Sequence, residues 1–291
     1  MSQADFTYDP VTAVDEASAT GETAEIFADI RATMAIPLVT SIWRGLASMD
    51  DSLQQVWAMT RPIYQRTDPA LALADVVTAT DLPAPSPLNR AQRARAGLSD
   101  QDLNAVRTIV AAYNRSNGMN LVTLAALLAA PTNSATPIAA IAAPAQWDRY
   151  PTLLAKEEIA PETWQLVTQV NCFGAHNDAA NVATLWRHLA HWPSLLSLVH
   201  ESFAPLQASG DISRATAQMV AHAKLVGSQL AAHRGDVSQM SKAAQTTITG
   251  YVHTPTQVIR MVTLGHALAR WLGVLEGTQA GTTIAMDLPD S

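Results

Sequence analysis

Cys172 and His176 are the residues whose types and spacing most directly suggest chemistry. They are four residues apart and would be neighbours on one helix face if the helix continues through Gly174. A thiolate in contact with an imidazole is a nucleophile beside its base, although a single cysteine more often serves as a small buried apolar side chain. Asp178 and Asn181 follow at helical spacing and would polarise a water molecule in a cavity, or cap a helix.

Two arginines have the chemistry to bind an acidic substrate. Arg44 and Arg187 each follow a tryptophan, Trp43 and Trp186, and adjacent residues on a helix diverge by about 100°. If each tryptophan faces the core, each arginine lies at the edge of the core and can hold a carboxylate in a bidentate pair. A structural ion pair, or a side chain that extends to the surface, is the alternative for both.

Asn117 is a third candidate. The pair Asn117-Gly118 follows a helix that is predicted to start near Ser99 and to end at residues 114–118, because Asn and Gly tolerate the positive φ of a C-cap. The apolar run Leu121–Leu124 supports a second interpretation, in which the amide points into the core and hydrogen-bonds a bound substrate. The sequence leaves both interpretations open.

Metal and cofactor sites are not indicated. All eight histidines lie at or after His176, and His188 and His191 are three residues apart, but no HExxH or CxxC pattern accompanies them. The phosphate-binding patterns GxGxxG and GxxxxGK(S/T) do not occur either. We therefore expect no metal and no nucleotide cofactor.

The elements that would position these residues are repeated along the chain. The stretch Ser41-Ile-Trp43-Arg44-Gly-Leu46-Ala47 recurs in the second half as Thr184-Leu-Trp186-Arg187-His-Leu189-Ala190. The same offset carries Pro62 onto Pro205. A duplicated helical unit implies two similar halves packed on one another, and the seam between such halves is a natural place for a pocket.

Both halves are predicted to be helical. Ala and Leu abound, and no stretch sustains the alternation of apolar and polar residues that is typical of strands. The segment from Pro131 to Pro144 is rich in Pro and Ala, has no amphipathic period and is predicted to join the halves. We expect an all-α pseudo-dimer with a pocket at its seam, built from a first repeat with arm and linker over residues 1–145 and a second repeat over residues 146–291.

Composition limits the classes of partner. With 291 residues, 48% of them hydrophobic and 15% charged, the chain can bury a large core. A net charge of -7 with scattered basic residues argues against nucleic acid. We expect a cytoplasmic protein without membrane contact. The chain has a single cysteine, residues 1–6 show no apolar leader, and no apolar run approaches the roughly 20 residues that a membrane span needs. A small-molecule substrate is the expected partner, and a homodimer is left open.

Several short motifs resemble, in their order and spacing, the group I α-haloacid dehalogenase family, which is all-helical and non-stereospecific. These motifs are Gly21-Glu22, Phe27-Ala-Asp29-Ile30-Arg31, Ile36-Pro37, Arg44-Gly-Leu46-Ala47, Tyr113-Asn114-Arg-Ser-Asn117, Ala190-His191-Trp192-Pro193 and Thr254-Pro255. The resemblance spans nearly the whole chain. It implies two tandem helical repeats with the active site between them.

The resemblance also implies an activity, the hydrolysis of 2-haloacids without a covalent ester intermediate. In that family an aspartate of the second repeat activates a water molecule that displaces halide at C2, and an asparagine of the first repeat assists in the pocket. The asparagine maps onto Asn117 and the aspartate onto Leu185. Two pocket aromatic positions of the family correspond to Leu38 and Ser41.

Because leucine cannot accept a proton, a hydrolase with this sequence needs another base, and we expect Asp178 or His176 to take that role. The predicted function is hydrolysis of a small 2-substituted carboxylic acid, 2-haloacids included. One alternative is a small-ligand binding protein on the same scaffold. Another is a Cys172- and His176-dependent enzyme, since their spacing resembles half of the Cys-x-x-Cys-x-x-x-His motif of the alkylhydroperoxidase AhpD-like group. Gln169 replaces the first cysteine of that motif, which excludes disulfide exchange within the site.

Overall fold

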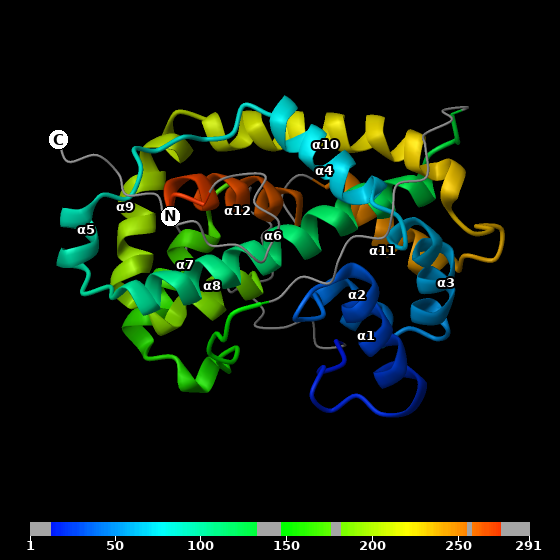
Figure 1. Ribbon diagram of the computed structural model, residues 1–291, viewed down its shortest axis with the longest axis horizontal. Coiled ribbons are helices and arrows are strands. Elements are labelled where there is room, and N and C mark those ends of the chain that lie inside the picture. Colours follow the sequence, from blue (N-terminus) through cyan, green and yellow to red (C-terminus); the bar gives the residue numbers. More distant parts are fainter. Residues whose placement is uncertain (1–12, 133–146, 176–181, 255–257, 275–291) are drawn as a thin grey trace.

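The computed structural model describes residues 13–132, 147–175, 182–254 and 258–274, and in these ranges the chain is helical without any strand (Figure 1). The α-helices are α1 (Gly21–Met34), α2 (Ser41–Leu46), α3 (Ser52–Tyr64), α4 (Asp68–Ala79), α5 (Arg90–Arg95), α6 (Asp100–Leu128), α7 (Pro161–Asn171), α8 (Thr184–His188), α9 (Pro193–Ala208), α10 (Asp211–Leu230), α11 (Lys242–His253) and α12 (Arg260–Trp271). Short 3₁₀ segments are η1 (Lys156–Glu158), η2 (Leu189–His191) and η3 (Ala231–His233). The predicted all-α fold class is confirmed. No helix in these ranges is both long and apolar enough to cross a membrane.

The longest helix, α6, lies along the middle of the molecule, and α4, α10, α11 and α12 pack on it (Figure 1). A capping box sets its start: the Ser99 hydroxyl accepts a hydrogen bond from the Asp102 N–H at 3.1 Å, and the Asp102 carboxylate accepts one from the Ser99 N–H at 2.9 Å. The end predicted at residues 114–118 is wrong, because the helix continues through Asn117-Gly118 to Leu128. Asn117 is therefore not a C-cap.

Close packing, rather than a helix end, explains Gly118. A Cβ atom at this position would lie 2.6 Å from both terminal methyl carbons of Leu73 on α4. Only glycine allows α4 to approach α6 this closely without moving that side chain. The intrinsic penalty of glycine within a helix is about 1 kcal/mol, which tertiary packing readily outweighs.

The described hydrophobic side chains form two cores, and α6 contributes to both. Core 1 contains Trp43 and combines α1 to α4 with residues 119–127 of α6 and with parts of α10 and α11. Core 2 contains Trp186 and combines α7 to α9 with residues 103–113 of α6 and much of α12. Because one continuous helix crosses both cores, the two clusters are tied into one packed body.

The positions of several helices follow the offset found in the sequence. The offset that carries Ser41, the start of α2, onto Thr184, the start of α8, also carries the start of α4 onto the start of α10. Pro62 lies inside α3 and Pro205 lies at the same offset inside α9. That the two halves superpose as a pseudo-dimer divided near residue 145 stays a prediction.

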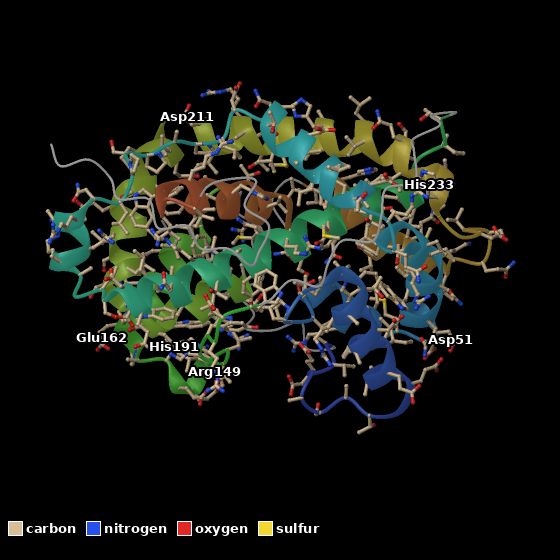
Figure 2. The ribbon with its side chains drawn as sticks, viewed as in Figure 1. Asp51, Arg149, Glu162, His191, Asp211 and His233 are labelled. Carbon is tan, nitrogen blue, oxygen red and sulfur yellow. The ribbon has the colours of Figure 1, made fainter. Side chains whose placement is uncertain are left out.

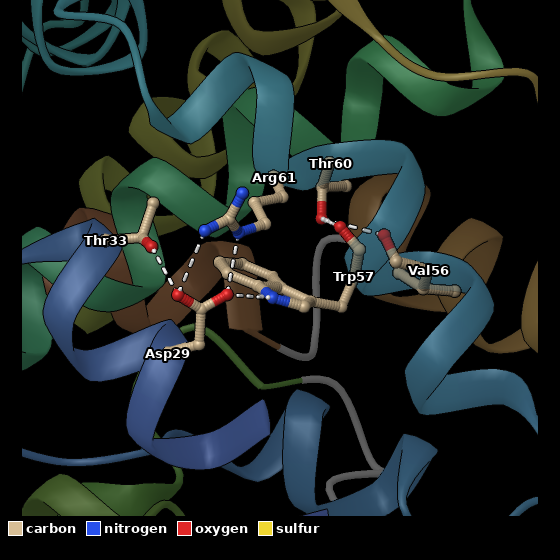
Figure 3. A network of polar contacts seen from close by, with 6 residues as sticks. All are labelled: Asp29, Thr33, Val56, Trp57, Thr60 and Arg61. Carbon is tan, nitrogen blue, oxygen red and sulfur yellow. Dashed lines mark hydrogen bonds and ion pairs between the residues drawn. The ribbon is translucent and has the colours of Figure 1, made fainter. Parts of the chain in front are cut away.

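A polar network fastens α1 to α3 in core 1 (Figure 3). The carboxylate of Asp29 accepts hydrogen bonds from Arg61 Nε at 2.7 Å, from Trp57 Nε1 at 2.8 Å and from the Thr33 hydroxyl at 3.3 Å. The hydrogen bond from Arg61 is the main cause that holds the pKa of Asp29 below its ordinary value, and the bonds from Trp57 and Thr33 act in the same direction. The charged form of Asp29 therefore stabilises the packing of α1 on α3.

Candidate functional site

A cavity of about 490 Å³ lies where α2, α6 and α8 approach the chain segments that precede α1 and η1. Its ionisable side chains include Glu16, Arg31, Arg44, Tyr113, Tyr150 and His188. These residues come from both sides of position 145 in the sequence. The cavity is large enough for a small organic acid and carries groups of both charges.

The first residues of α2 and α8, Ser41 and Thr184, both line this cavity. They are equivalent positions of the sequence repeat. The Thr184 side chain is also a hydrogen-bond neighbour of the Tyr113 hydroxyl. The first residues of two short helices that lie far apart in the sequence therefore line one cavity.

Arg44 is the buried cation of the cavity, with only 9% of its surface exposed. Its Nε donates a hydrogen bond to the carbonyl oxygen of Val14 at 2.8 Å. Its Nη2 lies 3.9 Å from Oδ1 of Asp15, which is a largely exposed carboxylate. A buried guanidinium whose nearest described counter-charge is exposed is suited to bind a ligand carboxylate.

A second cation, Arg31 on α1, is held by the chain segment that precedes that helix. It forms an ion pair with the Glu16 carboxylate, and both side chains are partly exposed. The other oxygen of Glu16 accepts a hydrogen bond from the Val39 N–H at 2.9 Å. Glu16 therefore connects the entering chain to α1 and to the residues before α2 while balancing the charge of Arg31 at the cavity.

His188, the last residue of α8, lies between two tyrosine rings. Its ring centroid is 5.9 Å from that of Tyr113 and 5.4 Å from that of Tyr150, both in edge-on geometry. Its Nε2 is 2.7 Å from the carbonyl oxygen of Pro151, and its Nδ1 is 3.4 Å from the Tyr113 hydroxyl oxygen. Because a carbonyl oxygen can only accept, Nε2 carries the proton of the neutral ring and Nδ1 carries the lone pair.

Electrostatics keep this pair neutral. Burial lowers the pKa of His188; the hydrogen bond to Pro151 opposes that shift, and the charges of His191 and Arg187 add to it. Burial also raises the pKa of Tyr113 to about 12. At pH 7 the cavity therefore presents an imidazole acceptor beside a phenol donor.

Three of the predicted substrate-binding residues, Arg44, Leu38 and Ser41, line the cavity. Arg187 is buried, and its Nη2 donates a hydrogen bond to the carbonyl oxygen of Leu154 at 2.8 Å. Burial has the largest effect on the pKa of Tyr113 and raises it, whereas the positive charge of Arg187 acts to lower it. Of these two arginines, Arg44 is among the described residues that line the cavity and Arg187 is not.

Leu185 and Asn117 are not among the described residues that line the cavity. Leu185 is 3% exposed and packs in core 2, directly after the cavity residue Thr184. Asn117 lies one helical turn beyond Tyr113, about 6 Å farther along α6, and its carbonyl oxygen accepts a hydrogen bond from Tyr251 at 3.4 Å. The turn of α6 that faces the cavity is therefore the one that carries Tyr113.

Cys172 is exposed at the end of α7, with Sγ 3.3 Å from the carbonyl oxygen of Thr168. The protein around the thiol raises its pKa by desolvation, whereas an activated cysteine needs a lowered pKa. His176, Asp178 and Asn181 lie outside the described residues. Within the described ranges, no group of three His, Cys, Asp or Glu side chains is placed to hold a metal ion.

Sequence reasoning missed several cavity residues. It considered His188 only as half of a metal spacing and did not single out Glu16, Tyr150 or Thr184. The repeat provided a signal for Thr184, which opens the second copy, and the Tyr113-Asn114 motif provided one for Tyr113. Glu16 and Tyr150 carry no local signal, because they reach the cavity from segments outside the helices.

Solved structures with a similar arrangement of helices identify the fold. No protein-family model and no curated protein matches the sequence. A complex of D-2-haloacid dehalogenase with L-LA matches with a TM-score of 0.73 and 15% identity, and a crystal structure of a D-2-haloacid dehalogenase mutant matches with 0.72 and 16%; each match covers 92% of this chain and 99% of the other. A mutant complex with D-2-CPA matches with 0.68 and 15%, covering 91% and 96%. This chain has the D-2-haloacid dehalogenase fold.

The structural matches cover nearly the full length of this chain, as the motif resemblance does. At 15–16% identity the likeness establishes the arrangement of helices, so the chemistry has to be argued from the cavity. The more distant resemblance to AhpD-like proteins stays a prediction.

Proposed function

We propose that this protein binds a small 2-substituted carboxylic acid, 2-haloacids included, in the cavity and hydrolyses it by attack of water at C2. One observation carries the proposal: a buried arginine, Arg44, and a neutral hydrogen-bonding pair, Tyr113 and His188, line one cavity of a D-2-haloacid dehalogenase fold. A guanidinium forms charge-assisted, bidentate hydrogen bonds with a carboxylate. These bonds gain strength where water is excluded.

The proposal includes the arrangement of the chain as two helical repeats, residues 1–145 and 146–291, with the cavity at their seam. The common offset of helix starts and of inner-helix prolines supports it. So does the lining of the cavity, which draws the equivalent residues Ser41 and Thr184 from the two copies. A substrate bound there would contact both repeats.

The proposed reaction replaces the substituent at C2 by a hydroxyl group. Water supplies the oxygen, the substituent leaves with its bonding electron pair, and a base takes the proton of the water. Such a base typically contributes about 10² to 10⁴ in rate. Leu185 cannot supply this function, and the expectation from sequence assigns it to Asp178 or His176, with Asn117 as an assisting amide.

A small-ligand binding protein is the second candidate, and the buried, apolar Leu185 favours it. A chain that kept the cavity without a base would bind the acid and leave it unchanged. The Cys172-dependent alternative has less support, because the pKa of that thiol is raised rather than lowered. Binding and turnover of the same acid distinguish the two stronger candidates.

The test is halide release from D- and L-2-chloropropionate by the purified full chain, alongside binding of propionate, which lacks the leaving group. We expect release by the wild type and an increase in KM of about 10- to 100-fold in Arg44→Gln, which corresponds to loss of one buried charged hydrogen-bond pair. Arg214→Gln is the matched control, since Arg214 is exposed on α10 and pairs with Asp211. If the protein binds propionate but releases no halide from 2-chloropropionate, it is a binding protein instead.

Position 185 offers a second test. Leu185 packs in core 2, directly after the cavity residue Thr184, at the position that the family resemblance aligns with the water-activating aspartate. If that alignment places the family site here, Leu185→Asp brings a carboxylate to the cavity and raises halide release. Leu185→Asn is the matched control, because it has the same size and lacks the base. Equal halide release by both variants, with retained thermal unfolding transitions, would contradict the transfer of the family site onto this position.

A further inference from the structure

The two copies of the repeat differ at one position beside the shared arginine. Arg44 is followed by Gly45, and Arg187 by His188. Gly45 has open space where a Cβ atom would lie, whereas His188 is 3% exposed and forms part of the cavity wall. The second copy therefore places an imidazole where the first copy has no side chain.

The hydrogen bonds of His188 direct its unprotonated nitrogen toward the hydroxyl of Tyr113, which also lines the cavity. The Pro151 carbonyl oxygen fixes the Nε2–H at 2.7 Å, so the lone pair of Nδ1 is on the side of Tyr113. The Tyr113 hydroxyl is 3.4 Å from Nδ1, at the long end of a hydrogen bond. A water molecule that hydrogen-bonds both groups can replace this weak direct contact.

We propose that His188 Nδ1 is the base that accepts the proton of the attacking water, in place of Asp178 or His176. This inference rests on the proposed hydrolysis and names its base. The oxygen of the water forms a bond to C2 as the bond from C2 to the halogen breaks, and the halide leaves with the electron pair. The water proton passes to Nδ1 and then to solvent, so that acid and water yield the 2-hydroxy acid, halide and a proton.

The surroundings of His188 suit a base that works near neutral pH. The charged and titratable groups around it are Tyr113 on α6, Tyr150 on the segment before η1, Arg187 on α8, His191 on η2 and, across the cavity, Asp15, Glu16, Arg31 and Arg44. Burial and the nearby cations keep the imidazole neutral. The Pro151 carbonyl, as an acceptor for Nε2–H, stabilises the imidazolium that forms during the reaction.

The direct test is His188→Gln, whose amide can still donate to Pro151 while it lacks a base. We expect kcat for 2-chloropropionate to fall about 10²- to 10⁴-fold, with KM and the binding of propionate unchanged within a factor of three. His191→Gln is the matched control: His191 makes the same kind of bond, Nε2 to the Thr152 carbonyl oxygen at 2.8 Å, outside the cavity wall (His191 is labelled in Figure 2). At pH 8 we expect this control to keep wild-type kcat.

The dependence of the wild-type kcat on pH is a test that does not depend on whether a variant folds. Because His188 must be neutral to accept a proton, kcat should rise with pH through a pKa below the ordinary 6.5 of histidine and then stay level. A rise near pH 4 would point to a carboxylate base and overturn the proposal. The His176→Gln variant should keep the wild-type kcat and the same rise of kcat with pH. An inactive His176→Gln variant would also overturn the proposal.

The remaining outcomes separate this inference from the proposed function. A wild type that releases halide together with an equally active, folded His188→Gln variant would refute the role of His188 and leave the hydrolase intact. A wild type that binds propionate but releases no halide from either enantiomer would refute hydrolysis, and the base with it. Tyr113→Phe should lower kcat, because the hydroxyl orients the water, while kcat still rises with pH over the same range, because His188 remains the base.

Discussion

Trp43 and Trp186 occupy corresponding positions of the sequence repeat but have different surroundings. Both are buried, the first in core 1 and the second in core 2. Trp43 Nε1 donates to Oδ1 of Asn120 at 3.1 Å, and the same oxygen accepts a hydrogen bond from the Tyr64 hydroxyl at 2.9 Å. The amide nitrogen of Asn120 donates to the Thr40 hydroxyl at 2.9 Å, so one buried amide satisfies three neighbours.

Among the described residues, the equivalent position of the second half has no such network. Thr263 lies at the offset position that corresponds to Asn120, and its hydroxyl donates to the carbonyl oxygen of Ile259 at 3.0 Å. Trp186 Nε1 is buried and has no hydrogen-bond partner among the described residues. Leaving such a donor unpaired costs about 1 to 3 kcal/mol.

The comparison separates what the repeat shares from what each copy adds. Both copies keep a buried tryptophan followed by an arginine that donates to a backbone carbonyl, of Val14 for Arg44 and of Leu154 for Arg187. The first copy adds buried polar bonds that stabilise core 1. The second copy adds an imidazole, His188, to the cavity wall, and we attribute the chemistry to that addition.

Removal of the shared amide should give the largest effect. Asn120→Ala leaves Trp43, Tyr64 and Thr40 without a common partner in core 1, and we expect the free energy of unfolding to fall by about 3 to 4 kcal/mol. Thr263→Ala removes one bond within its own helix and should lower it by about 1 kcal/mol. Urea unfolding followed by circular dichroism measures both values, and equal losses would contradict the proposed difference between the copies.

Paired tryptophan substitutions sharpen the same comparison. Trp43→Phe removes a donor that Asn120 uses, whereas Trp186→Phe removes a donor that has no partner among the described residues. Both changes remove a similar volume, so the difference between their effects on the free energy of unfolding should reflect the hydrogen bond. We expect Trp43→Phe to lower that free energy by about 1 to 2 kcal/mol more than Trp186→Phe does. A larger loss for Trp186→Phe in the same unfolding experiment would show that its indole nitrogen has a partner outside the described residues.

The starts of some helices could be predicted from sequence, because similar residue types at a constant offset favour similar local structure. The start of α8 and the inner proline of α9 occur where the first copy places them. The end of α6 could not be predicted, since Asn117-Gly118 has the local pattern of a helix end, while the structure packs Leu73, which is distant in sequence, closely against the glycine.

The candidate site shows the same limit. The motif resemblance pointed to Arg44, Leu38 and Ser41, and all three line the cavity. His188 became a candidate only when the structure placed Tyr113 and Pro151 against its two nitrogens. Sequence spacing reports neighbours along a helix, whereas this imidazole is oriented by α6 and by the segment before η1.

The first copy also has a pH-dependent contact that the second lacks. Asp29, with its pKa lowered mainly by Arg61, corresponds to Cys172 in the repeat. Because Asp29 is 37% exposed, solvent screens the pair, and we expect Asp29→Asn to lower the free energy of unfolding by about 1 kcal/mol at pH 7. Because the pKa of Asp29 is lower in the folded protein, its charged form stabilises the fold at pH values above the unfolded-state pKa of about 3.9. The difference between wild type and variant should therefore shrink as the pH falls below 4, and Cys172→Ser should show no such dependence.

The smallest expected effect concerns the carboxylate that precedes α1. Glu16 balances Arg31 at the cavity, and its charge would repel the carboxylate of a substrate. Glu16→Gln removes the charge while its amide oxygen can still accept from the Val39 N–H, so we expect KM for 2-chloropropionate to fall about two- to fivefold with kcat unchanged. The change should diminish in 0.5 M salt, because screening weakens interactions between partly exposed charges. Glu201→Gln, which removes an exposed carboxylate paired with Arg95 away from the cavity wall, should leave KM unaltered. A rise in KM for Glu16→Gln would mean that Glu16 mainly positions Arg31 for the substrate, and that the first copy contributes two cations rather than one to carboxylate binding.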